Sequence, residues 1–425
     1  MVSFLLVLFV VGYITITLEQ SIQINKSATA LITAVLCWTL IVLNADNKEI
    51  VIDSLTHHLS AISEIVFFLL GAMTIVELID AHDGFQQIAE AIKTTHKTKL
   101  VWLIALITFF LSAVLDNLTT TIVMISILNK LIQDKKVKWL LLGLVIIASN
   151  AGGAWSPIGD VTTTMLWIGG QITPINIVKQ VFFASLVSMA LPTLIVNYLI
   201  KGPITLKPVI ENNLNFNSNV FERNLIFYVG IGCLLFVPIF KTFTHLPPYM
   251  GMLLCLGIIW VVTELLHKKK ADDEKGILSV NHAIRKIDTP SILFFFGILM
   301  AIASLEYVGV LPQMAAYLNS SIGNINIVAI AIGLLSAVFD NVPLVAALQS
   351  MYTLEQYPQD HYFWELLAYT AGTGGSCLII GSAAGVAVMG IEKIDFFWYL
   401  KKVSWIALIG FLAGAAVFML QHAYL

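Results

Sequence analysis

Two aspartate–asparagine pairs stand at the ends of long apolar runs in this sequence. The stretch "SAVLDN" covers residues 112–117, and "SAVFDN" follows 224 residues later at 336–341. A charged side chain at the centre of a lipid bilayer costs roughly 2.5–3.5 kcal/mol on insertion scales, so it is seldom kept without a function. Carboxylate and amide oxygens are the ligands that small hard cations prefer. The pairs therefore indicate cation binding at membrane depth.

More oxygen-bearing side chains follow each pair, and none of them is His, Lys or Arg. Such surroundings suit a small hard cation, whereas an anion would need a fixed positive charge or many free amides. We expect cation and proton binding at Asp116, Asn117, Thr120, Ser149, Asn150, Asp160, Thr163, Thr164, Asp340, Asn341 and Thr373. The sodium ligands among these are predicted to be Asp116, Asn117, Asn150 and Asp160.

The two sets of polar residues are unequal. Asp160 aligns with Ser382, and "TTT" at 162–164 aligns with "AAG" at 383–385. The second half thus lacks hydroxyl groups and one carboxylate, and we expect the principal cation site in the first half. An aspartate at a helix end is also a common N-cap, and for Asp160 a cap on the following half-helix stays open beside ion binding.

The carboxylates suggest a mechanism. Burial favours the neutral, protonated form of a carboxyl group, so a buried aspartate can hold either a proton or a metal ion, and the two compete. If only the neutralised site can cross the membrane, proton flow in one direction drives cation flow in the other. Such exchange needs no enzymatic chemistry and no cofactor, and sodium is its expected substrate.

The composition places these residues in a membrane. Of the 425 residues, 58% are hydrophobic and only 12% are charged, with a mean hydropathy of +0.88; soluble domains average about 25% charged residues. Uncharged stretches approach the ~20 residues that a membrane-spanning helix needs. The chain is predicted to be an all-α polytopic membrane protein. Its net charge of −3 and lack of a basic tail argue against nucleic acid as a partner.

The chain is predicted to contain an internal duplication. Besides the Asp-Asn pairs, "AGGAWSPIGD" at 151–160 aligns with "TGGSCLIIGS" at 373–382, and "FFLLGAM" at 67–73 aligns with "LFFFGIL" at 293–299. The matches keep their order at nearly constant offset, which predicts repeats at 1–200 and 223–425 joined by a cytoplasmic linker at 201–222. Short or Gly/Pro-interrupted segments at matching places in two halves point to a transporter's binding site.

Counting crossings predicts that the repeats are inverted. Three crossings are expected at 2–17, 26–43 and 60–79, and one each at 138–170, a helix broken in the middle, and at 175–200. The segment 100–132, bent at Asp116, is expected to be a re-entrant hairpin. Five crossings is an odd number, so the second half must run the opposite way, with its hairpin at 325–350 and its broken helix at 363–390.

Basic residues test this topology. Of the 23 Lys and Arg residues, the predicted topology leaves only Lys48, Lys179 and Lys241 on one side of the membrane. Lys and Arg concentrate in cytoplasmic loops, so both termini are expected outside the cytoplasm. The predicted location is a bacterial inner (cytoplasmic) membrane.

Four stretches resemble a known family. "SAVLDNLTTTIVM", "SNAGGAWSPIGDVTTTMLW", "SAVFDNVPLVAAL" and "GTGGSCLIIGSAAG" are similar to those of the NhaD-type sodium/proton antiporters, in the wider ion-transporter superfamily. The resemblance extends over essentially the whole chain. It implies inverted repeats with opposed hairpins and broken helices, and a homodimer in which a transport domain moves against a scaffold, as in an elevator.

Two other functions compete with antiport. Related dicarboxylate carriers have Ser-Asn-Thr at the hairpin bends, where this chain has Asp116-Asn117-Leu118 and Asp340-Asn341-Val342. This difference favours exchange of sodium, or of lithium, for protons over sodium-coupled symport of a small anion. An intramembrane aspartyl protease would carry G-x-G-D, whereas the residues before Asp160 are Pro157, Ile158 and Gly159.

Overall fold

The computed structural model describes residues 1–92, 94, 96–200, 219–268, 270 and 276–424, and their regular structure is helical. The first half contains α1 (Val2–Thr17), α2 (Glu19–Ile22), α3 (Lys26–Asn44), α4 (Lys48–Ala81), α5 (Gln86–Ala91), α6 (Lys97–Leu115), α7 (Asn117–Leu131), α8 (Lys135–Ala154), α9 (Val161–Ile168) and α10 (Pro174–Leu199).

The second half contains α11 (Val220–Thr244), α12 (Pro248–Leu266), α14 (Val280–Lys286), α15 (Thr289–Tyr307), α16 (Val310–Ile322), α17 (Ile325–Leu335), α18 (Asn341–Met351), α19 (Tyr362–Gly374), the 3₁₀ turn η1 (Gly375–Cys377), α20 (Ala383–Glu392), α21 (Phe396–Tyr399), the π-helical turn η2 (Leu400–Ser404) and α22 (Trp405–Tyr424). The predicted linker falls largely on residues 201–218, which lie outside the described residues.

The length of the helices confirms a multi-pass membrane protein. Nine helices of the described part are long and apolar enough to cross a bilayer, or ten if the bent pair α16–α17 is one span. One of the nine is α6, the first arm of the predicted hairpin. The prediction for 60–79 was too short, because α4 continues N-terminally through the polar residues from Lys48 as one helix of 34 residues.

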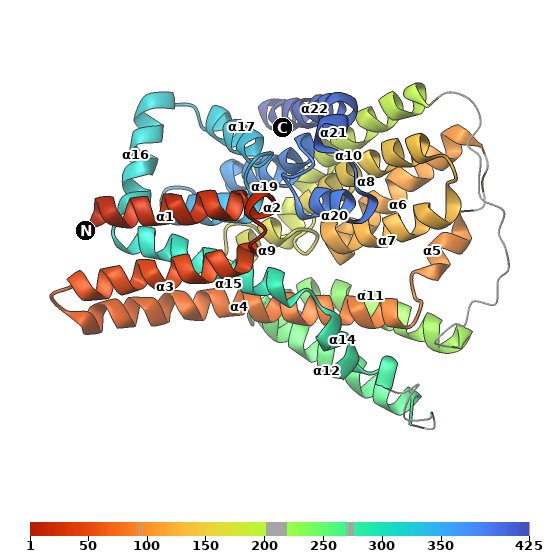
Figure 1. The fold of residues 1–425 in the computed structure, drawn as a ribbon, viewed down its shortest axis with the longest axis horizontal. Coiled ribbons are helices and arrows are strands. Elements are labelled where there is room, and N and C mark those ends of the chain that lie inside the picture. Colours follow the sequence, from red (N-terminus) through yellow and green to blue (C-terminus); the bar gives the residue numbers. More distant parts are fainter. Residues whose placement is uncertain (93, 95, 201–218, 269, 271–275, 425) are drawn as a thin grey trace.

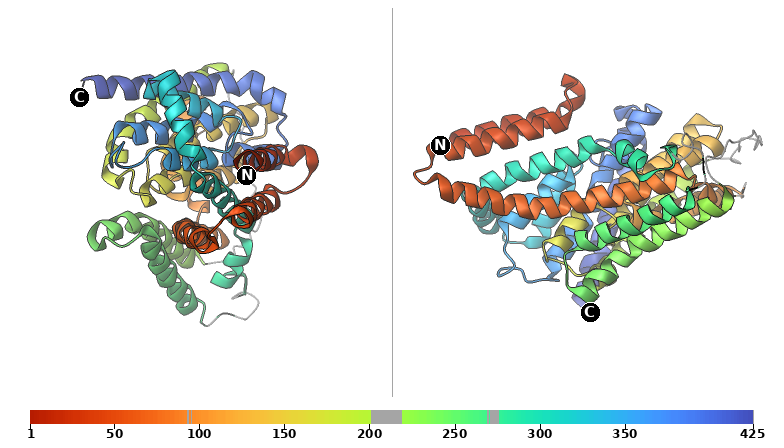
Figure 2. Two further views of the ribbon diagram at one scale, coloured as in Figure 1. Left: turned by 90° about the vertical axis from the view of Figure 1, so that its left-hand side faces the viewer. Right: turned by 90° about the horizontal axis from the view of Figure 1, so that it is seen from below.

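Two packed groups of helices make up the molecule (Figures 1 and 2). The lower group in Figure 1 consists of α1, α3, α4, α11, α12, α14 and α15, where α3 packs on α15 and α4 packs on α12. The upper group consists of α6–α10 and α17–α22, where α8 packs on α6 and α10 packs on α22. Helices α15 and α18 are in contact across the boundary between the groups.

The same close contacts occur in both halves of the upper group. A Cβ added to Gly152 of α8 would lie 2.1 Å from the carbonyl oxygen of Phe109, and one added to Gly374 of α19 would lie 1.9 Å from that of Gly333. Only glycine permits such an approach of two backbones. The predicted breaks at "AGG" and "TGG" thus coincide with helix ends that are packed backbone to backbone.

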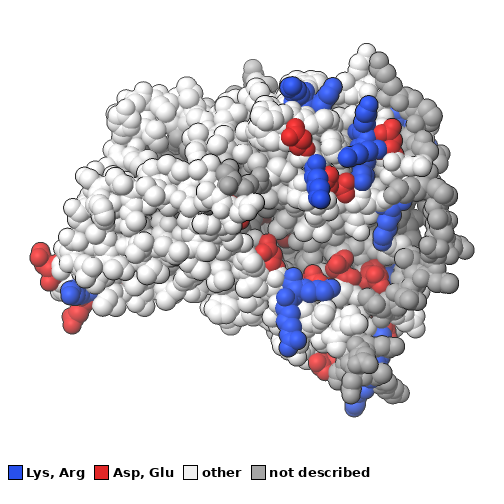
Figure 3. All heavy atoms as spheres, in the orientation of Figure 1, with Lys and Arg blue, Asp and Glu red and all other residues white. Residues whose placement is uncertain are grey.

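Lys and Arg gather on one part of the surface. On the face shown in Figure 3, most blue residues lie in the right-hand half, whereas the left-hand half is largely uncharged. Helices α6 and α7 lie toward the right of Figure 1, and α16 and α17 toward the left. The four cysteines are free and buried, as expected for small apolar side chains.

Candidate functional site

Asp116 forms the bend between α6 and α7 and has a strained backbone. Its φ of 80° and ψ of 162° place it in a region of the Ramachandran plot that is essentially reserved for glycine. Its carboxylate caps α7 by accepting hydrogen bonds from the Thr119 backbone N–H at 2.8 Å and the Thr119 hydroxyl at 2.9 Å. Strain of this kind persists where the surrounding structure enforces it, which is common at functional sites.

Asn117 connects the hairpin to the broken helix. Its amide nitrogen donates to Oδ1 of Asn150 at 3.0 Å and to Oδ2 of Asp160 at 2.8 Å. All three side chains are at least nine-tenths buried. The structure thus brings together Asn117, Asn150 and Asp160, three of the four residues predicted as sodium ligands. Asp116, the fourth, lines the same small cavity as Asn117 and Asp160.

Asp160 lies in the break between α8 and α9 and caps α9. Its Oδ1 accepts hydrogen bonds from the backbone N–H and the hydroxyl of Thr162, each at 2.9 Å. The alternative of an N-cap is therefore observed for Asp160. Capping uses Oδ1, while Oδ2 faces Asn117. One carboxylate can thus hold the half-helix and contribute to an ion site.

Asn150 links the two halves of the chain. Its amide nitrogen donates to the hydroxyl oxygens of Ser376 and Ser382, at 2.9 and 3.0 Å. Ser382 also caps α20 by accepting from the Gly385 backbone N–H, as Asp160 caps α9. At the positions that align, an aspartate therefore faces the site from the first half and a serine from the second.

Asp340 has a different environment from Asp116. Its φ is −55°, and its carboxylate lies 3.2 Å from the ammonium group of Lys26 at the start of α3. The expectation of a site without basic side chains is therefore wrong for the second half. No pattern in the sequence predicts this pair, because 314 residues separate its members.

A small cavity of about 70 Å³ lies between the hairpin bends and the break of the first broken helix. It is lined by Asp116, Asn117, Asp160, Asp340, Asn341 and Lys26, with Thr164 beside them. A second cavity of about 640 Å³ lies next to it, and Lys26, Met73 and Leu118 line both. Glu19, Glu77, Asp80 and Asp288 contribute carboxylates to the larger cavity. An ion in the larger cavity is thus next to the buried aspartates.

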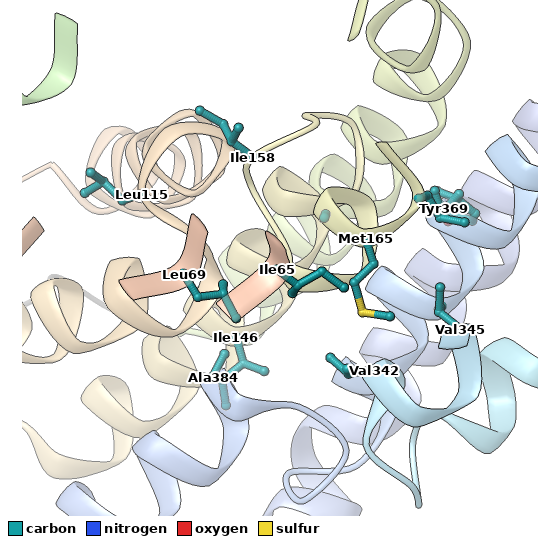
Figure 4. Close-up of a cluster of buried hydrophobic side chains, with 14 of the residues drawn as sticks. Ile65, Leu69, Leu115, Ile146, Ile158, Met165, Val342, Val345, Tyr369 and Ala384 are labelled. Atoms are coloured by element: carbon teal, nitrogen blue, oxygen red, sulfur yellow. The ribbon is translucent and has the colours of Figure 1, made fainter. Parts of the chain in front are cut away.

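Apolar side chains from both groups line the small cavity, and Leu69, Leu115, Ile158 and Val342 among them are labelled in Figure 4. Ile65 of α4 and Met165 of α9, labelled in the same view, line a separate cavity. A site bounded in this way has a low effective dielectric constant, so its charges interact strongly.

Five predicted site residues do not line the small cavity. Ser149 accepts a hydrogen bond from Thr121 and donates to the Ile146 carbonyl; Thr163 donates to the Asp160 carbonyl and Thr373 to the Tyr369 carbonyl. Thr120 is buried, and its hydroxyl has no partner among the described residues. Asn150, the fifth, is hydrogen-bonded to Asn117 of the site, and the cavity is lined directly by Asp116, Asn117, Asp160, Thr164, Asp340 and Asn341.

Known proteins that this chain resembles are named as transporters. A sequence model of the citrate transporter family matches residues 6–374. Sodium/proton antiporter 1 of Arabidopsis thaliana is 48% identical over 416 residues, which cover 98% of this chain and 72% of the plant protein. Sodium/proton antiporter 2 of the same plant is 46% identical over 419 residues, covering 98% and 99%. The Na(+)/H(+) antiporter NhaD of Alkalimonas amylolytica is 29% identical over 445 residues, covering 98% and 90%.

Proposed function

Because the chain belongs to the NhaD-type sodium/proton antiporters within the citrate transporter family, we propose that it exchanges sodium for protons at the carboxylates of Asp116 and Asp160. The chain is a multi-pass transporter and not an enzyme. The observation that supports this site best is the small cavity, where both aspartates meet Asn117 next to the larger cavity. Lithium is a second candidate ion.

Competition couples the two ions. In our proposal, protons occupy the carboxyl groups of Asp116 and Asp160 when sodium is absent, because burial opposes their charge. Sodium bound by oxygens of Asp116, Asn117 and Asp160 would compensate the same negative charge and displace the protons. The apparent KM for sodium should therefore rise as pH falls, because protons occupy the carboxylates that sodium needs.

The two groups of helices provide a route for movement. The larger cavity is bounded by α4 and α15 of the lower group and by α7 and α20 of the upper group. A third cavity, of about 380 Å³, lies between the same groups, where Glu64 and Glu306 of the lower group face Gln349 of the upper group. In our proposal the upper group carries the site past the lower group as an elevator, the halves are inverted repeats, and the protein is a homodimer.

The orientation in the membrane also belongs to the proposal. We place the larger cavity on the cytoplasmic side, because Lys286 and Lys26 lie on its walls and basic residues favour that side. Both termini then lie outside the cytoplasm. A bacterial cytoplasmic membrane is the proposed location, although the plant relatives are more similar in sequence than the NhaD protein of Alkalimonas amylolytica.

A liposome assay tests the function. Purified protein is reconstituted into vesicles that contain a pH-sensitive dye and a preset pH gradient, with no organic anion present. Addition of sodium should dissipate the gradient, and addition of potassium should have a much weaker effect. No response to sodium at any pH from about 6 to 9 would contradict the proposal.

Symport of a small anion is the second candidate, and Lys26 is the observation that favours it. An anionic substrate would need such a fixed positive charge. Asp340 already neutralises this ammonium group, however, and two further carboxylates line the small cavity. Sodium-driven uptake of a labelled dicarboxylate into the same vesicles would establish this alternative.

A further inference from the structure

The position of Lys26 is unfavourable for its own helix. Lys26 is the first residue of α3, where the helix dipole is positive and a cation is disfavoured. The helix start is nevertheless firmly held: Asn25 caps the Ser27 backbone N–H, and the Ser27 hydroxyl donates to the Pro290 carbonyl of α15. The local structure therefore fixes the backbone of Lys26 without using its charge.

The side chain of Lys26 is directed to the ion site. Its ammonium group lies 3.2 Å from Oδ2 of Asp340 and 4.2 Å from the centre of the Phe294 ring. The two side chains of the pair retain only 28% and 25% of their exposure, so solvent screens the pair incompletely. Lys26 belongs to the lower group and Asp340 to the upper group, and the pair lies where the two cavities meet.

Asp116, which aligns with Asp340 in the duplication, has no basic partner of this kind among the described residues. At the offsets that relate the halves, the counterparts of residue 26 fall within "PYMGM" at 248–252, which holds no basic residue. Among the described residues, no Lys or Arg forms an ion pair with Asp116 or Asp160. One of the three aspartates in the small cavity thus has a permanent counter-charge, and the other two do not.

We propose that Lys26 is a tethered cation that neutralises Asp340 and confines sodium to the Asp116–Asp160 side of the cavity. Lys26 is then a specificity-determining residue, because its charge occupies the carboxylate that the duplication would otherwise offer as a second cation site. This inference rests on the proposed function and adds a division of labour between the two hairpin aspartates.

The proposal predicts opposite effects from the two partners. Lys26→Gln removes a positive charge and frees Asp340, so the apparent KM for sodium should fall on the order of tenfold, the effect of one unit charge over about 10 Å at an effective dielectric constant of roughly 20. Asp340→Asn leaves the ammonium group unpaired beside the site, so the KM should rise by a similar factor. Combining both changes should return the KM close to that of the unmodified protein.

Controls separate charge from structure. Lys26→Arg keeps the charge and should keep the KM. Lys286→Gln removes the same charge from the wall of the larger cavity, where the side chain is 51% exposed and does not line the small cavity; it should change the KM less than twofold because solvent screens it. Lys26→Cys adds a chemical test, because modification with an aminoethyl thiosulfonate restores the charge on folded protein and should restore the KM.

The decisive assay measures sodium-dependent proton movement in liposomes, together with sodium binding to the purified variants. Shifts of opposite sign, with a second sodium bound by Lys26→Gln, are the expected result. Shifts of the same sign, or none, in an active protein would overturn the role of Lys26 and leave antiport intact. Absence of sodium-dependent proton movement in the unmodified protein would instead contradict the proposed function. If Lys26→Gln does not fold, the role of Lys26 is tested by the KM for sodium of Asp340→Asn and of Lys26→Cys before and after modification.

Discussion

The carboxylates of Asp116 and Asp160 carry the proposed exchange at the scale of the residue. Asp116→Asn and Asp160→Asn keep the size of the side chain and remove its charge, so each should abolish sodium-dependent proton movement, by at least a hundredfold, while folded protein remains in the membrane. Vesicle fluorescence and size-exclusion chromatography measure the two properties. Asp46→Asn, in the exposed loop between α3 and α4, is the matched control and should remain active. Normal exchange by either site variant would remove that residue from the site.

The backbone strain at Asp116 gives a second prediction. Asp116→Gly removes a carboxylate of the proposed ion site. It also relieves backbone strain of about 1–3 kcal/mol. The loss of the helix cap costs only a few tenths of a kcal/mol, because glycine is itself a tolerated N-cap residue. The variant should therefore be inactive but at least as resistant to thermal unfolding as the unmodified protein. Asp288→Gly is the control, since Asp288 caps α15 by accepting from the Ser291 backbone N–H and hydroxyl and has a φ of −73°, which offers no strain to relieve. A lower melting temperature for Asp116→Gly than for Asp288→Gly would contradict this account.

The unequal caps of α9 and α20 give a third prediction. Asp160→Ala removes a carboxylate of the proposed sodium site, whereas Ser382→Ala removes a hydroxyl that accepts from Asn150 and Gly385. A buried donor left without its acceptor costs about 1–3 kcal/mol. We expect Ser382→Ala to lower stability and keep measurable exchange, while Asp160→Ala loses it. Equal transport rates in the two variants would undo the assignment of the principal site to the first half.

At the scale of the element, glycines hold the broken helices against the hairpins. Gly152→Ala and Gly374→Ala would each bring a Cβ to about 2 Å from a backbone carbonyl oxygen. Because the clashing atom belongs to the backbone, a change of side-chain rotamer cannot relieve the clash. Each should destabilise the protein by about 1–3 kcal/mol or more. Gly257→Ala in α12 is the control, because nothing lies within 4 Å of the added Cβ, and it should be neutral or slightly stabilising. Thermal unfolding in detergent compares them.

At the scale of the whole molecule, the two groups of helices should move relative to each other. Cysteines at Glu64 of α4 and Gln349 of α18 face each other across the third cavity, and a short thiol-reactive linker between them should block exchange. Cysteines at Glu64 and Glu306 line the same cavity from the lower group alone, so the same linker should have little effect there. Transport rates before and after linking decide the matter. Equal inhibition of both variants would contradict movement between the groups.

The sequence by itself determined the features that depend on local pattern. Uncharged stretches predict membrane helices, because polar backbone groups must be satisfied within the bilayer, and the structure confirms an all-helical, multi-pass protein. The Asp-Asn pairs and the "GG" motifs place the helix ends near Asp116, Asp340, Gly152 and Gly374, close to where the structure has them. Helix α16 was missed, because Pro312 and the polar residues at 319–321 interrupt its apolar pattern.

Only the tertiary structure decided how these parts meet. Asn150 reaches Ser376 across 226 residues, and Lys26 reaches Asp340 across 314. No periodicity or motif specifies such contacts, because they arise when whole helices pack and bring distant helix ends to one place. Lys26, taken from the sequence as one basic residue near a membrane surface, thus becomes the counter-charge of the partly buried Asp340. The residue types of the site come from the sequence, and the difference between its two halves comes from packing.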